Sequence, residues 1–206
     1  LLSITEGDIT REGGYPLSRQ RLAEIHIELL ERGAIGVGWV VAFPQEDRFG
    51  GDDQFAEALS YSPSVLAMFE NEGSGYPPTT GTVILGEERG GIDSSGVIQN
   101  IGKLRENASQ GIAVARADVD SLVRRLPLLM KTPDGWVPSY ATEVMKILAG
   151  ADTYVIKTNE SGIEEIRVKG LPPVKTDYNG RKWISWVDTP ETDLKSMEVE
   201  GKFVFV

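Results

Sequence analysis

The segment 34–43 constrains the fold more than any other part of the sequence. It is an almost unbroken apolar run that includes Val37, Trp39, Val40 and Val41. A strand without polar alternation is buried on both faces, which is typical of a parallel sheet covered by helices. The run follows an amphipathic stretch, 18–32, with Ser18 as the predicted N-cap and Gly33 as the predicted end. Residues 1–43 therefore predict a strand–helix–strand unit with a right-handed crossover.

The alternation of helix and strand continues in the next segment. Asp52 or Asp53 is the predicted cap of a second helix. Its inner face consists of Phe55, Ala58 and Leu59. A strand follows at 65–69, and this alternation is that of an α/β fold. The region 71–111 is rich in glycine and polar residues, with one apolar island at 82–85, and predicts a long, mobile loop region.

The pattern becomes antiparallel in the second half of the chain. A hairpin is predicted for Ile112–Met130 with its turn at Asp118–Ser121, so Arg124 and Arg125 should point to opposite faces of a strand. The later elements are a helix near 139–148 and strands at 154–157, 163–168, 182–187 and 203–206. We therefore predict an α/β fold with a mixed sheet. Its N-terminal half is a parallel βαβ arrangement with helices on both faces, and its C-terminal half consists of antiparallel hairpins.

Length and composition limit the possible functions. With 206 residues, 40% of them apolar, and no cysteine, the chain is predicted to form a single domain, 1–206, without disulfides. Lys and Arg number 21 against 31 for Asp and Glu, and the net charge of −10 is the reverse of what a nucleic-acid binder carries. No nucleic-acid partner and no cofactor are predicted. The abrupt apolar start at 1–5 indicates a fragment of a longer protein.

No motif for catalysis or metal binding is recognised, so neither catalytic residues nor a metal site is predicted. The single histidine, His26, is interpreted as an exposed or boundary residue without a function. Asp118-x-Asp120 resembles the start of a calcium loop, and a plain turn is the favoured alternative. A calcium loop needs glycine at its sixth position and glutamate at its twelfth, where Val123 and Leu129 stand.

Five charged residues are candidates for a ligand site. Arg19 is predicted to lie in the first turn of the first helix, above the end of the first strand, where open α/β sheets bind ligands. Glu6 and Asp8 follow that strand, and Asp52 and Asp53 follow the next one. Two simpler alternatives remain open. Arg19 could pair with Glu6 or Asp8 at the surface, and the two aspartates could favour the positive N-terminus of their helix.

Five blocks of the sequence, in this order, resemble one family. They are ITEGDITREGGYPLSRQRLAEIHIELLERGAIGVGWVVAF from Ile4, DDQFAEAL from Asp52, DVDSLVRRLPLL from Asp118, PSYATEV from Pro138, and DYNGRKWISW from Asp177. Together they resemble the CHASE (cyclases/histidine kinases associated sensory extracellular) domain of the second class. The block from Asp118 is the most specific, because it is similar to the family's Asp-x-Asp-Gly-x-x-Arg-Arg-x-Pro-Leu signature.

The resemblance implies a sensory domain that is not an enzyme. It implies the extracellular or periplasmic part of a bacterial inner-membrane receptor, flanked by transmembrane helices of the same chain. The output would be a nucleotide cyclase, a histidine kinase or a protein kinase. The implied partners are an unknown small-molecule ligand and a second copy in a homodimer. Two alternatives stay open, namely a soluble α/β enzyme with an acidic site near Glu6 and Asp8, and a structural dimerisation spacer.

Two positions depart from the family pattern. Thr5 stands where the first strand is expected to carry aspartate, and Val40 stands where the second strand is expected to carry one. Ends of strands joined by one crossover are neighbours, and a single acid left there would be costly to bury. We therefore expect a coupled change that makes the inner wall of the pocket less acidic. Ser121, in place of a turn glycine, is a milder change.

Overall fold

Two compact units make up the chain. The computed structural model describes residues 1–196 and 198–206. The first unit consists of Leu1–Ala67, Asn100–Ser109 and Val187–Val206, and the second of Met68–Gln99 and Gln110–Trp186. The first unit contains parallel strand pairs and the second mainly antiparallel ones, which confirms the mixed α/β fold class. The single domain over 1–206 and the helices on both faces of its sheet stay predictions.

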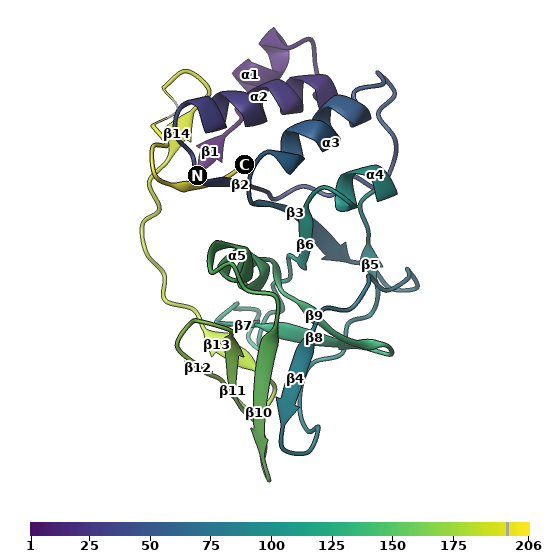
Figure 1. Ribbon diagram of the computed structural model, residues 1–206, viewed down its shortest axis with the longest axis vertical. Coiled ribbons are helices and arrows are strands. Elements are labelled where there is room, and N and C mark those ends of the chain that lie inside the picture. The colour runs from purple at the N-terminus through teal and green to yellow at the C-terminus, as the bar shows by residue number, and fades with distance from the viewer. Residues whose placement is uncertain (197) are drawn as a thin grey trace. The chain divides into compact units, whose positions relative to one another are not determined.

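A parallel sheet forms the centre of the first unit (Figure 1). Its strands pair in the order β15 (Phe203–Phe205), β2 (Gly36–Trp39) and β3 (Ser64–Glu70). The helix α3 (Asp52–Ser60) joins β2 to β3, so the chain contains a parallel strand–helix–strand motif. The far end of β3 belongs to the second unit, where it pairs antiparallel with β5 (Val97–Ile98).

The two long helices of this unit begin and end where the sequence predicts, within one or two residues. In α2 (Arg19–Glu31) the Ser18 side chain accepts a hydrogen bond from Arg21 N, and Gly33 takes a positive φ of 88° just after the helix. The predicted inner face of α3 is buried, and α2 and α3 lie side by side (Figure 1). Each large apolar side chain buried in this way contributes about 1.5–3 kcal/mol.

The N-terminal strand differs from the prediction. β1 (Leu2–Ser3) pairs in parallel with β14 (Thr192–Asp193) and is not a neighbour of β2. The strand–helix–strand unit predicted for residues 1–43 is therefore wrong. A short helix, α1 (Glu6–Arg11), follows β1. Thr5 starts it by a capping box with Asp8, and this local signal ends the strand after two residues.

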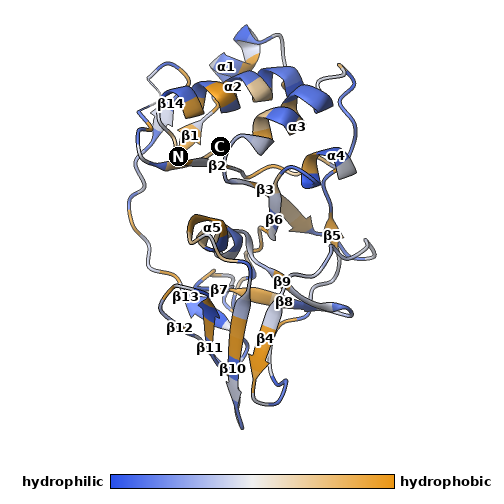
Figure 2. Cartoon of the chain, viewed as in Figure 1, coloured by the Kyte–Doolittle hydropathy of each residue, from blue (hydrophilic) through white to orange (hydrophobic). Residues whose placement is uncertain are grey.

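The second unit is built around a four-stranded sheet. Its order is β12 (Val174–Lys175), β11 (Gly162–Val168), β10 (Tyr154–Asn159) and β4 (Thr82–Leu85). β4 and β10 are apolar along much of their length and pair in parallel, while the other pairs are antiparallel (Figure 2). The predicted helix is α5 (Tyr140–Leu148), with Ser139 as its N-cap. The apolar island at 82–85 is thus the edge strand of a sheet, and its Val83 and Leu85 side chains are exposed.

The predicted hairpin over Ile112–Met130 is wrong. β6 (Ser109–Ile112) pairs with β3, residues 113–124 form no strand, and the remaining residues divide between two other pairings. Those pairings are β7 (Arg125–Pro127) with β13 (Arg181–Trp183), and β8 (Leu129–Thr132) with β9 (Gly135–Pro138). The turn at Asp118–Ser121 does form, with Ser121 N donating to Asp118 O over 2.9 Å. The region 71–111 is also more regular than predicted, because it contains β4, β5, α4 (Gly102–Arg105) and most of β6.

Candidate functional site

A pocket opens at the carboxyl ends of the parallel strands of the first unit. Its volume is about 620 Å³, and all of its lining residues belong to this unit. Trp39 at the end of β2 and Val206 just after β15 lie in its wall. The remaining lining residues are Leu2, Ile4, Ile9, Tyr15, Pro16, Leu17, Arg19, Leu22, Val41, Ala42, Phe43, Pro44, Gln45, Glu46, Asp47 and Arg48. Ligands of open α/β sheets bind at this edge, and a pocket of this size can hold a small organic molecule.

Arg19 is the inner cation of this pocket. It is the first residue of α2, and its guanidinium carbon lies 4.2 Å from the centre of the Phe43 ring. Nη2 donates to Gln45 O over 3.3 Å, and Nε lies 3.5 Å from Asp52 Oδ1 in an ion pair. Only 13% of the side chain is exposed. Burial lowers the pKa of Arg19 while Asp52 and Asp47 oppose the change, and an arginine stays charged under these conditions.

Asp47 fixes the loop that carries the outer wall. Its carboxylate accepts hydrogen bonds from the backbone N–H groups of Arg19, Phe49 and Gly51, at 2.8, 3.1 and 3.2 Å. Its own N–H donates to Asp52 Oδ2 over 2.8 Å. Burial acts to raise the pKa of Asp47, but these three donors hold it below its usual value. The loop is therefore attached to the first turn of both α2 and α3.

A glycine is required where this loop meets α2. A Cβ atom built on Gly51 would lie 2.3 Å from Gln20 N, which no side chain can tolerate. The sequence signal for this loop is Asp47 followed by Gly50-Gly51, a pattern typical of a turn in which the aspartate accepts from nearby N–H groups. Asp47 was not among the five predicted ligand residues, although this pattern indicates its role in the loop.

The five predicted ligand residues do not gather at one place. Arg19 lines the pocket, and Asp52 lies directly behind it as its ion-pair partner. Asp53 is exposed and pairs with Lys103 Nζ at 2.6 Å, outside the lining. Glu6 and Asp8 are in the first turn of α1 and do not line the pocket either.

The role of Asp8 is to begin α1. It accepts hydrogen bonds from the Thr5 N–H and hydroxyl, at 2.8 and 2.6 Å, and pairs with Arg11. The hydrogen bonds from Thr5, followed by the charge of Arg11, lower the pKa of Asp8. Asp52 does not cap α3 with its side chain, because the N-cap is Gly51 and no side-chain cap bond forms.

The two family departures lie in different surroundings from those expected. Thr5 is the N-cap of α1, and β1 belongs to a different sheet from β2. Val40 is 43% exposed, so an acid at this position would not be buried. Thr5 and Val40 therefore do not follow neighbouring strands of one sheet, and the buried wall expected at Val40 is wrong.

His26 is buried completely, contrary to its interpretation as an exposed or boundary residue. Trp39 Nε1–H donates to His26 Nδ1 over 3.2 Å, which leaves Nε2–H to donate to Ser62 Oγ over 3.3 Å. Burial lowers the pKa of His26 to about 4. His26 therefore supports the Trp39 wall of the pocket from behind as a neutral ring.

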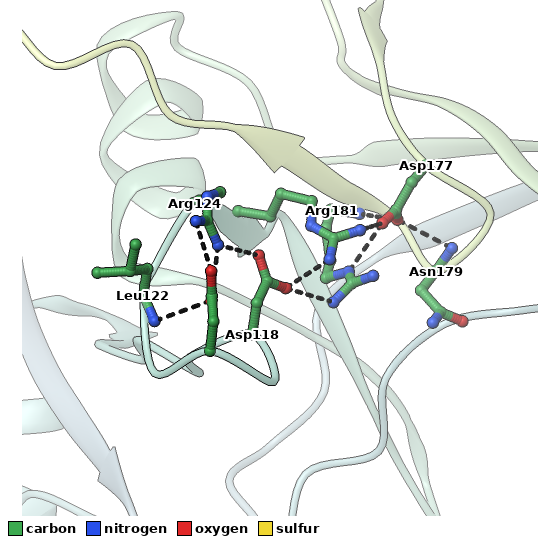
Figure 3. Close-up of polar contacts among 8 residues, drawn as sticks. Asp118, Leu122, Arg124, Asp177, Asn179 and Arg181 are labelled. Carbon is green, nitrogen blue, oxygen red and sulfur yellow. Dashed lines mark hydrogen bonds and ion pairs between the residues drawn. The ribbon is translucent and has the colours of Figure 1, made fainter.

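The second unit contains a cluster of charged residues (Figure 3). They come from the sequence block that begins at Asp118 and from the turn that begins at Asp177. Asp118 pairs with Arg124 at 3.6 Å, with Arg181 at 4.0 Å, and with Arg125. Asp177 pairs with Arg181 at 2.8 Å and with Arg125 at 3.2 Å, and also accepts from the backbone N–H groups of 179 and 181. The cluster joins the turn before β7 to the turn before β13. Its contacts serve to hold these two turns together.

The described residues contain no group of three or more His, Cys, Asp or Glu side chains that could hold a metal ion. Among the same described residues, no helix is long and apolar enough to cross a membrane.

Comparison with known proteins gives one match. The family model described as the CHASE2 domain matches residues 1–206 of the chain. No curated protein and no solved structure matches it. The match agrees with the resemblance carried by the five sequence blocks.

Proposed function

The chain belongs to the CHASE2 domain family, and on that premise we propose that it is the signal-input domain of a bacterial inner-membrane receptor. CHASE2 domains are extracellular sensory domains found in receptors, and they are not catalytic. The domain would lie on the periplasmic or extracellular side, between transmembrane helices of the same chain. Its output would be a nucleotide cyclase or a histidine or protein kinase, working as a homodimer.

The ligand site of this receptor would be the pocket that contains Arg19. The observation that carries this proposal is the origin of the lining residues. Leu2 and Ile4, from the start of the described chain, and Val206, from its end, line the same pocket. A molecule in the pocket would contact both ends at once. It could shift the receptor between two states if its affinity differs between two arrangements of these ends.

The alternative of an enzyme with an acidic site has less support. Its motivation was a pair of acids, Glu6 and Asp8, at the mouth of the pocket. Asp8 is committed to Thr5 and Arg11, and neither acid lines the pocket. An enzyme of this kind would need a different set of residues.

A pocket-filling variant tests the ligand site. Ala42 lines the pocket, so Ala42→Trp should occupy part of its volume. We expect a small-metabolite thermal-shift screen to yield a compound that raises the melting temperature of the parent but not of Ala42→Trp. Ala117→Trp, at an exposed position of the second unit, is the control and should respond as the parent does.

The proposed role as the signal-input domain is tested in the full-length receptor. A compound found in the screen should change the activity of the output domain, and Ala42→Trp should abolish that change. If no compound stabilises the parent, or if every stabilising compound acts equally on Ala42→Trp, the pocket is not a ligand site. The dimerisation spacer would then account better for the domain.

A further inference from the structure

We propose that this pocket takes a mainly apolar molecule that carries a single carboxylate. The inference rests on the proposed function, because it names the class of ligand for the same site. Three properties of the pocket support it, namely the nature of its walls, the free donors of its inner cation, and the balance of charge around that cation.

The walls of the pocket are apolar apart from Arg19 and the outer loop. Leu2, Leu17, Trp39 and Phe43 are each at least nine-tenths buried, and they belong to the hydrophobic core of the first unit. Apart from Arg19 and the hydroxyl of the exposed Tyr15, the polar lining residues come from one loop segment, 45–48. A ligand that fills the interior must therefore be apolar over most of its surface, since polar groups buried there would find few partners.

Arg19 has hydrogen-bond donors to spare. Within the described residues, its contacts use the main-chain N–H, Nε and Nη2, and they leave Nη1 without a partner. Nε is shut off from solvent, whereas Nη1 remains accessible. Because the side chain lines the pocket and is 13% exposed, its accessible atoms face the pocket space. Stacking on Phe43 holds the guanidinium in place, and a planar carboxylate matches its fork of donors.

The charge balance limits the ligand to one negative charge. Asp52 already neutralises part of the Arg19 charge from behind. A phosphate or a dicarboxylate would bring more negative charge than this shared guanidinium can balance, and the other arginine of the lining, Arg48, is exposed in the outer loop. A cation would find no free acid inside, because Asp47 is saturated by three N–H groups and Glu46 is exposed in the outer loop.

The test compares three probes with the same ten-carbon chain. They are decanoate, 1-decanol and decylammonium, each used below its critical micelle concentration in titration calorimetry at pH 7.5. We expect decanoate to bind one site per chain, about tenfold or more tightly than 1-decanol, and decylammonium to bind least. Ala42→Trp should abolish the binding of decanoate.

Variants of the cation identify the contact. Arg19→Met keeps an unbranched stem over Phe43 but leaves Asp52 without a counter-ion, so the balanced variant Arg19→Met/Asp52→Asn accompanies it. Both should lose the preference for decanoate over 1-decanol and still bind 1-decanol. Arg32→Met removes an arginine of similar character just after the same helix, paired with Glu28, and should leave the preference unchanged.

The possible results separate this inference from the proposed function. If 1-decanol or decylammonium binds as tightly as decanoate, or if the balanced variant keeps the preference, the carboxylate inference is wrong while the pocket remains a ligand site. If none of the three probes binds and polar metabolites stabilise the parent through the pocket, the inference fails in the same way. If nothing binds in the pocket at all, the proposed function fails as well.

Discussion

At the scale of single residues, His26 carries a measurable pH dependence. The ring is 0% exposed, and burial lowers its pKa from 6.5 to about 4. Between these values the unfolded chain binds a proton that the folded chain does not, so stability should fall as the pH falls through this window. The full effect is about 3 kcal/mol, and this group adds no further loss below pH 4.

Chemical denaturation at a series of pH values between 7 and 4 measures this loss. Carboxylates also titrate in this range, so the informative quantity is the difference between the parent and His26→Gln. The variant should be less stable at pH 7 and should lose less stability on acidification. If the free energy of unfolding fell equally with pH in the two proteins, the assignment of a neutral, buried His26 would be contradicted.

Val40 provides a second prediction at this scale. Because its side chain is 43% exposed, Val40→Asp should change the free energy of unfolding by less than about 1 kcal/mol. Val37, three residues earlier in β2, is 0% exposed, so Val37→Asp should cost several kcal/mol, since its carboxylate would be buried without a partner. Urea denaturation of both variants gives the comparison. A large loss for Val40→Asp would show that this side chain is buried.

At the scale of elements, the charge cluster around Asp118 and Asp177 holds the turns before β7 and β13 together, and we call this cluster the clamp. Asp118 is 18% exposed and faces three arginines, so Asp118→Asn should cost about 1–3 kcal/mol by leaving Arg125 and its neighbours short of one acid. Asp120 forms an exposed pair with Arg124 alone, so Asp120→Asn should cost about 0–1 kcal/mol.

A double-mutant cycle checks that the cost comes from the clamp. Asp118→Asn combined with Arg125→Met should lose less than the sum of the two single variants, because the two side chains interact directly. Additive losses would place the effect of Asp118 elsewhere. Equal losses for Asp118→Asn and Asp120→Asn would also refute the clamp.

Elements with strong local signals could be predicted from the sequence. α2 has a serine cap and a terminal glycine, and α3 presents a regular apolar face, so both were found with little error. The hairpin over Ile112–Met130 failed for a different reason. Its turn forms locally, but β7 pairs with β13, more than fifty residues later, and no local pattern reveals that partner. The same holds for β1 and β14.

At the scale of the whole molecule, the candidate site was predictable only in part. Arg19 was identified because it begins a helix above a strand, and this position depends on local sequence. Val206 and Leu2 come together in the pocket wall only through pairings that span nearly the full chain, which composition and periodicity do not encode. The acids Glu6 and Asp53 were grouped with the site by their distance along the chain alone.

The place of β15 beside β2 has a consequence for the order in which the protein can be made. β2 is synthesised well before its partner on one side, because β15 follows every other helix and strand of the described residues. At ordinary rates of translation the nascent chain must keep this apolar strand half-paired for on the order of ten seconds or more. During that time the open edge is available to other chains, so a holding chaperone should matter more for this domain than for one whose neighbouring strands are consecutive.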